Sequence, residues 1–250
     1  MQVVNPSGIL GADYLSNSTH GAEWNADLLL HRRPRYEPPP SNMWSSADLY
    51  TSPGASSLSK TNDTIRSSHR SQKPSSIITL FDDDSASTSL CCVRPCRPLL
   101  EAILKHCEVT DGDNCPGPIF LSIGSASGLL EYLLQFVAGS KLQIYGIDVA
   151  NINVFLDSDR FVLIRSETPQ RSAIPDATIL FASYLRRPAL LPIYLEVCPH
   201  VTRVILVGPI SEDPFSDECV VTSMAGWRQV YGGAVGLRSW EQMKVFVMAE

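Results

Sequence analysis

The stretch that decides the fold is FLSIGSASGLLE, residues 120–131. A short apolar run is followed by a loop of glycine and serine, and then by a second segment rich in leucine. This order is typical of a strand, a tight turn and a helix, and it predicts a strand–helix unit over residues 118–139. The free N–H groups at the start of such a helix, and the glycines before it, can lie against a bound ligand.

Apolar segments with the length of buried strands recur after this unit. Four further strands are expected at residues 141–148, 160–167, 177–184 and 201–209. A helix is expected over 187–200, with Pro188 in its first turn. Continuous apolar strands separated by helices indicate a parallel sheet that is covered on both faces.

The end of the chain has a different pattern. Two strand candidates, residues 227–233 and 241–249, are joined by a short turn-rich segment and therefore predict an antiparallel hairpin. The fold class that follows is α/β: a Rossmann-like, seven-stranded, mostly parallel sheet with an antiparallel C-terminal hairpin. We expect residues 91–250 to form this single domain, with a helix over 97–108 before the first strand.

Residues 1–90 differ in composition from the rest of the chain. They contain 18 serines, a proline-rich stretch and almost no periodic apolar segments. Such a segment buries too little surface to offset the entropy of ordering it, so a mostly disordered Ser/Pro-rich tail is expected. A protein partner for this tail is a role that its composition allows.

Charge and hydropathy exclude several classes of partner. The 250-residue chain has a formal net charge of −6, whereas a general nucleic-acid-binding protein needs a basic face. No apolar run reaches the length of a membrane span, and the N-terminus lacks the features of a secretory signal. We therefore expect no nucleic-acid or membrane partner, and a cytoplasmic or nuclear location.

The seven cysteines fit reduced thiols rather than a disulfide framework. Three of them lie in CCVRPC, residues 91–96, but a metal site needs more ligands at a fitting spacing. The five histidines are scattered and form no ligand motif. We therefore expect no metal site.

Acidic residues follow the next two strands after the glycine loop. Asp148 ends the second strand, 20 residues after Gly128, where a carboxylate can accept hydrogen bonds from ribose hydroxyls. Glu167 follows the third strand and could meet an exocyclic amine of a base. Because ligands of open parallel sheets bind beyond the carboxyl ends of the strands, the loop and the two acids predict a site for an adenosine-type ligand.

Residues 119–250 resemble the class I S-adenosylmethionine-dependent methyltransferases. More narrowly, they are similar to fungal methyltransferase-like proteins whose first motif reads like LSIGSGTGLLE. The residues that carry the resemblance are LSIGSASGLLEYLL, IYGIDVA, DATILFASYLRRPALLPIYLE, VTRVILVGP and SWEQMKVFV. The resemblance implies S-adenosylmethionine as the cofactor and in-line methyl transfer to a small-molecule acceptor.

The resemblance also implies that the glycine loop wraps the methionine part of the cofactor. The loop residues in question are Ser122, Gly124, Ser125, Ala126 and Gly128. Ser122 stands where many members of the family have an acid, so one contact to the cofactor's amino group is lost. Ala126 replaces the middle glycine, and it is strained by about 1 kcal/mol if its φ angle is positive.

Further roles follow from the same resemblance. Asp148 would bind the ribose, Glu167 would lie near the adenine, and Ser183 and Tyr184 would face the transferring methyl group. Tyr184 is the candidate catalytic residue, because it is best placed to shape the acceptor site. Methyl transfer depends mainly on positioning, so the lack of an obvious catalytic base does not argue against it.

Three functions remain compatible with the sequence. The first is an active methyltransferase, and the second is a catalytically inactive relative that serves as a binding or regulatory module. Ser122 and Ala126 favour the second. The third is an NAD(P)-dependent reductase, but the Tyr-x-x-x-Lys signature of short-chain reductases is missing, since Pro188 lies four residues after Tyr184.

Overall fold

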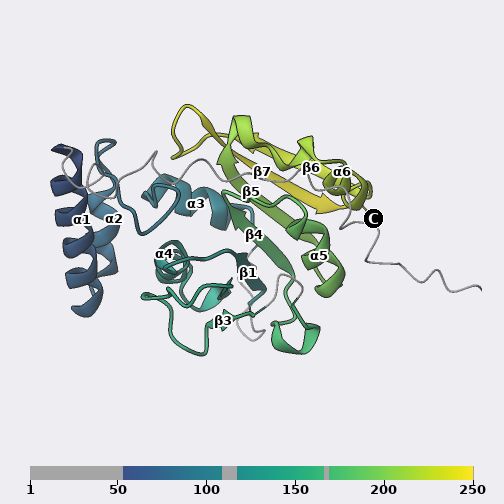
Figure 1. Cartoon of the computed structure of the whole chain (residues 1–250), viewed down its shortest axis with the longest axis horizontal. Helices are drawn as coiled ribbons and strands as arrows, with labels where there is room; N and C mark the ends of the chain where they lie inside the picture. The colour runs from purple at the N-terminus through teal and green to yellow at the C-terminus, as the bar shows by residue number, and fades with distance from the viewer. Residues whose placement is uncertain (1–52, 109–116, 166–168, 250) are drawn as a thin grey trace, which may run out of the picture. The chain divides into compact units, whose positions relative to one another are not determined.

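A seven-stranded sheet lies at the centre of the structure, a computed structural model that describes residues 53–108, 117–165 and 169–249 (Figure 1). The described residues belong to one unit, residues 49–250. The strand order is β3-β2-β1-β4-β5-β7-β6. The strands are β1 (Ile119–Ile123), β2 (Gln143–Asp148), β3 (Phe161–Leu163), β4 (Ile179–Ser183), β5 (Arg203–Pro209), β6 (Trp227–Gly233) and β7 (Glu241–Met248).

Strands β1 to β5 pair in parallel, and β7 pairs antiparallel with both β5 and β6. The predicted fold class is therefore confirmed, including the reversed hairpin at the end of the chain. Strand β1 lies between β2 and β4, so the strand order reverses beside it. This reversal opens a crevice at the carboxyl ends of these strands, where doubly wound sheets bind their ligands.

Helices cover both faces of the sheet, as the apolar strands require. One core cluster joins the sheet to α3 (Arg97–Lys105) and α4 (Leu129–Ala138). A second cluster joins the opposite face to α5 (Leu190–Val197) and α6 (Glu218–Ser223). Helix α5 begins after Pro188, which was expected in its first turn. No helix in the described ranges has both the length and the apolar character needed to cross a bilayer.

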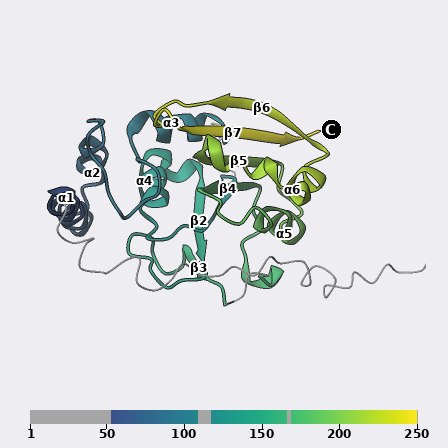
Figure 2. The same ribbon diagram turned by 45° about the horizontal axis from the view of Figure 1, so that its top comes forward.

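Two helices precede α3 and correct the predicted tail for residues 53–90. They are α1 (Pro53–Arg70) and α2 (Pro74–Leu80), which lie together at the side of α4 (Figures 1 and 2). Ile65, Ile77, Ile78 and Phe81 are fully buried in the same core cluster as α3 and α4. A few well-placed apolar side chains thus order a segment whose composition is otherwise polar. The remainder of the predicted tail, residues 1–52, lies outside the described residues.

The two edges of the sheet are formed by β3 and β6 (Figure 2). Strand β3 has three residues, fewer than the segment 160–167 that was expected to form it. Strand β6 is longer, but its pairing with β7 shifts register between Gln229 and Tyr231, which is a β-bulge or a similar irregularity. Both edges are therefore short or interrupted.

Candidate cofactor site

A cavity of about 460 Å³ lies beyond the carboxyl ends of β1, β2 and β3. Gly124 and Asp148 line it from the loops that follow β1 and β2, and Ile164 lines it from the end of β3. Leu190 and the buried Tyr194 close the opposite wall from α5. The cavity therefore lies in the crevice that the topology predicts, with an apolar wall and a carboxylate at its mouth.

The glycine loop after β1 contains three residues in the left-handed region: Gly124, Ala126 and Gly128 have φ angles of 72°, 51° and 78°. The N–H groups of Gly124 and Ser125 donate to the carbonyl of Ile147 at 2.8 and 3.2 Å, which fixes the loop to β2. Ala126 therefore has the positive φ angle that makes an alanine strained by about 1 kcal/mol.

Gly128 is required for a second reason, because a side chain there would collide with the loop after β2. A Cβ atom would lie 2.7 Å from Oδ1 of Asn153 and 2.9 Å from Cγ of Leu156. Both distances are below normal contact, so a larger residue would push this loop away from α4. Glycine at this position thus sets the close packing of the two loops that border the cavity.

Asp148 holds the glycine loop in place. Its Oδ2 accepts a hydrogen bond from the N–H of Ala126 and its Oδ1 accepts one from the N–H of Ala150, both at 2.9 Å. Each carboxylate oxygen has a further lone pair, so a hydroxyl can still donate to it. Asp148 therefore both builds the loop and presents acceptors to the cavity.

A buried carboxylate lies behind the loop, and the sequence analysis did not identify it. The hydroxyl of Ser122 donates to Oε1 of Glu131 at 2.5 Å, and the exposed fractions of these two residues are 1% and 2%. Oε2 of Glu131 is buried without a hydrogen-bond partner. Burial raises the pKa of Glu131 to about 7. The available signal was a single acid within the apolar helix sequence LLEYLLQFVA.

Two serines of the loop have different environments. Ser127 donates from its hydroxyl to the carbonyl of Leu90 at 2.5 Å, so the chain that precedes α3 lies against the loop. The hydroxyl of Ser125 is buried and has no hydrogen-bond partner. A side chain at Gly146 of β2 would collide with it, which shows that Ser125 packs onto the sheet.

The structure thus brings most of the predicted binding residues together at one edge of the sheet. The residues at or beneath the loop are Ser122, Gly124, Ser125, Ala126, Gly128 and Asp148. Glu167 lies outside the described residues. Ser183 ends the neighbouring strand β4, where it pairs with Val207 of β5. The binding roles of these residues stay predictions.

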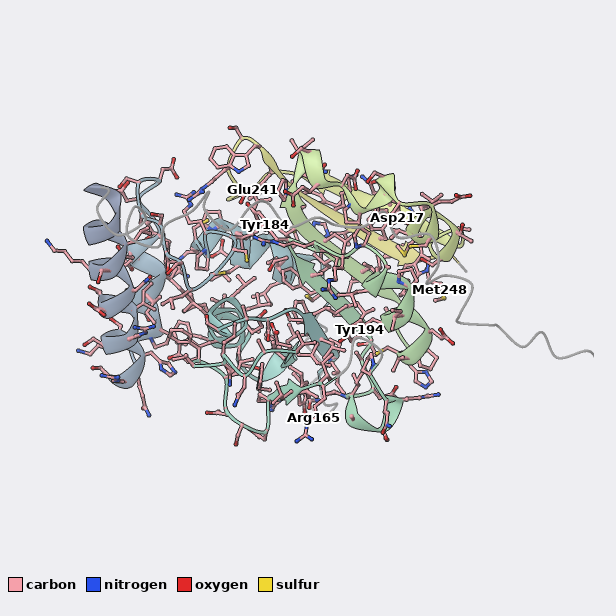
Figure 3. All side chains as sticks on the ribbon, viewed as in Figure 1. Arg165, Tyr184, Tyr194, Asp217, Glu241 and Met248 are labelled. Carbon is pink, nitrogen blue, oxygen red and sulfur yellow. The ribbon has the colours of Figure 1, made fainter. Side chains whose placement is uncertain are left out.

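Tyr184 follows β4 and also has a positive φ angle, 53°. Its hydroxyl donates to Oε1 of Glu241 at 2.5 Å, and Figure 3 shows the two residues side by side. Oε2 of the buried Glu241 accepts a hydrogen bond from the N–H of Arg238 at 2.8 Å. Burial, together with the hydrogen bond to Glu241, raises the pKa of Tyr184 to about 12. The predicted catalytic role of Tyr184 stays a prediction.

A second cavity, of about 590 Å³, lies beside Tyr184. Leu185 and Pro188 contribute apolar surface to it, and Arg186 and Glu212 contribute opposite charges. Within the described residues, no group of three or more His, Cys, Asp or Glu side chains is arranged to hold a metal ion.

Several solved structures have a similar fold. TrmN from Thermus thermophilus is 15% identical with a TM-score of 0.44, and the match covers 60% of this chain but only 48% of TrmN. A SAM-dependent methyltransferase from Aquifex aeolicus is 19% identical with a TM-score of 0.44, over 70% of this chain and 98% of its own. Human N-acetylserotonin methyltransferase, in complex with SAM, is 12% identical with a TM-score of 0.40, over 61% and 54%.

No protein-family model matches the sequence, and no curated protein matches it either. The similar structures have low identities and low scores. The function proposed below therefore rests on the residues of this chain.

Proposed function

We propose that the chain binds S-adenosylmethionine in the cavity of about 460 Å³ and transfers its methyl group to a small-molecule acceptor. The observation that carries the proposal is the geometry around Asp148. A glycine loop in left-handed conformation is fastened to this carboxylate at the mouth of a cavity with an apolar wall. An adenosine needs these two elements, acceptors for its ribose hydroxyls and an apolar surface for its base.

The residues at the site fit such a ligand. A Cβ atom at Gly124 would meet nothing within 4 Å, so the backbone at the start of the loop is open to a ligand. Two buried oxygens without partners, on Ser125 and Glu131, lie at the loop and behind it. When bound, the cofactor would supply an electrophilic methyl group, and the residues of the chain would bind and orient it.

The cavity beside Tyr184 supports a small acceptor. Its volume of about 590 Å³ lies within the range of sites for metabolite-sized ligands. A tyrosine whose pKa is raised to about 12 keeps its proton at neutral pH. Tyr184 would therefore shape the acceptor site and would not act as the base.

A binding or regulatory module without catalysis is the second candidate function. It is favoured by one observation: both oxygens of Asp148 already accept hydrogen bonds from the backbone of the chain. A carboxylate that serves the loop in this way can persist after ligand binding has been lost. The measured affinity for S-adenosylmethionine separates the two candidates.

The test is calorimetric titration of the full chain with S-adenosylmethionine and, separately, with NADPH. We expect micromolar binding of S-adenosylmethionine and no binding of NADPH. Val149 lines the cavity and is 61% exposed, so Val149→Arg should block binding without unfolding the protein. Val221→Arg, at a 50% exposed site on α6, is the matched control.

Each contrary result has a definite meaning. If the folded chain does not bind S-adenosylmethionine at millimolar concentration, the proposal fails and the module without catalysis takes its place. Binding of NADPH alone would instead indicate a reductase. If the cofactor binds, formation of S-adenosylhomocysteine in the presence of small acceptors distinguishes the enzyme from the module.

A further inference from the structure

We infer that Glu131 is a binding residue for the ammonium group of the cofactor's methionine end. The inference rests on the proposed function and deepens it, because it assigns a ligand contact to a residue that belongs to the helix rather than to the loop. It also accounts for the serine at position 122.

The first observation is the unfinished hydrogen bonding of Glu131. Its side chain is buried, Oε1 accepts from Ser122, and Oε2 has no partner. Leaving a buried carboxylate oxygen without a donor is costly, and such groups are nearly always paired. A buried oxygen of this kind therefore indicates a donor that is supplied from outside the chain.

The second observation is the position of this carboxylate. Ser122 is the fourth residue of β1, where it pairs with Gly146 of β2 and with Phe181 of β4. The Ser122–Glu131 pair therefore lies behind the point at which the strand order reverses, two residues before Gly124. The unpartnered hydroxyl of Ser125 belongs to the same loop. Polar groups without partners thus gather where the ligand's amino-acid end would enter.

The third observation is the charge around Glu131. The ionisable groups that interact with it in the described structure are Asp148 from β2 and the thiols of Cys91 and Cys92, which precede α3. None of these is a cation, and Asp148 adds to the rise in the pKa of Glu131 that burial causes. An incoming ammonium would therefore stabilise the ionised carboxylate, with a charge-assisted hydrogen bond to Oε2.

The experiment compares two ligands that differ at the amino-acid end alone. S-Adenosylhomocysteine has this end, and 5′-methylthioadenosine lacks it; neither has a charged sulfur. We expect Glu131→Gln to weaken S-adenosylhomocysteine by roughly 10- to 100-fold and to leave 5′-methylthioadenosine unchanged. Glu196→Gln makes the same chemical change at an exposed position of α5, and it should alter neither affinity.

A rescue variant distinguishes binding from a merely structural role. Ser122→Asp combined with Glu131→Gln returns a carboxylate to the same pair from the strand side. It should restore most of the lost affinity for S-adenosylhomocysteine. A structural role for Glu131 predicts instead that both ligands weaken equally in Glu131→Gln, and this result would overturn the inference.

Other results overturn it as well. If S-adenosylmethionine weakens in Glu131→Gln and S-adenosylhomocysteine does not, the carboxylate recognises the sulfonium and not the ammonium. If the unaltered chain binds none of the three ligands, the proposed function itself fails. Should Glu131→Gln not fold, the unaltered chain still tests the inference, because its preference for S-adenosylhomocysteine over 5′-methylthioadenosine should rise several-fold between about pH 5.5 and about pH 7. A flat preference would contradict it.

Discussion

The glycine loop places an alanine where the backbone favours glycine. Ala126 has a φ angle of 51° and donates its N–H to Asp148, so the position is held by the hydrogen bond and not by its own preference. The sequence showed that glycine is missing, but the sign of φ depends on the fastening of the loop to β2. Burial of Glu131 was likewise hidden in the sequence, because a glutamate in the first turn of a helix is usually exposed.

Replacing Ala126 with glycine tests the strain directly. We expect Ala126→Gly to raise the free energy of unfolding by up to about 1 kcal/mol, because glycine adopts a positive φ without steric cost. Chemical denaturation followed by circular dichroism measures the change. Ala138→Gly is the control: this residue has a right-handed helical conformation, and glycine there should destabilise by about 1 kcal/mol. Destabilisation by Ala126→Gly would contradict the assigned backbone.

The raised pKa of Glu131 predicts a specific dependence of stability on pH. Its ordinary pKa is 4.5 and its value in the folded protein is about 7, so the folded state holds the extra proton between these values. The stability contributed by this group is fully present below pH 4.5 and is lost as the pH rises through 7. The loss should be of the order of 3 kcal/mol and absent from Glu131→Gln. Parallel slopes for both proteins in urea denaturation from pH 5 to pH 8 would refute it.

At the scale of elements, a side-chain pair joins two strands that are not neighbours in the sheet. Tyr184 follows β4 and Glu241 begins β7, and β5 lies between these strands. The tyrosine hydroxyl therefore satisfies a carboxylate that the hairpin buries. This pairing could not be predicted from the sequence, because the two residues are 57 positions apart.

Removing the hydroxyl should affect stability more than cofactor binding. We expect Tyr184→Phe to lower the free energy of unfolding by roughly 1–3 kcal/mol, since one buried oxygen of Glu241 loses its donor. The affinity for S-adenosylmethionine should stay within about twofold, because the pair lies away from Asp148. Thermal denaturation and calorimetry give the two values. An unchanged stability would show that water replaces the lost hydrogen bond.

The strands and the antiparallel hairpin were predictable from their apolar runs, because a strand buried on both faces has a clear pattern. Helices α1 and α2 were not predictable in the same way. Their stability comes from four buried side chains within a serine-rich segment, Ile65, Ile77, Ile78 and Phe81. Composition averages over such a segment, whereas the core depends on where the few apolar residues fall.

At the scale of the whole molecule, the segment before residue 91 is part of the core. Each of the four buried side chains contributes about 1.5–3 kcal/mol, and their sum is comparable with the total stability of a typical domain. We therefore expect a chain that begins at residue 91 to lose cooperative unfolding, and a chain that begins at residue 53 to retain it. Scanning calorimetry of the two chains makes the comparison. Equal transition temperatures would show that α1 and α2 are dispensable.

The irregular pairing in β6 has a consequence for how these molecules behave at high concentration. A free strand at the edge of a sheet is a template on which another chain can add its own strand, and long, flat edges promote such growth. The register shift between Gln229 and Tyr231 interrupts the row of donors and acceptors on one edge, and β3 offers only three residues on the other. An open sheet can thereby remain free of strand-by-strand aggregation while its opposite, ligand-facing ends stay accessible.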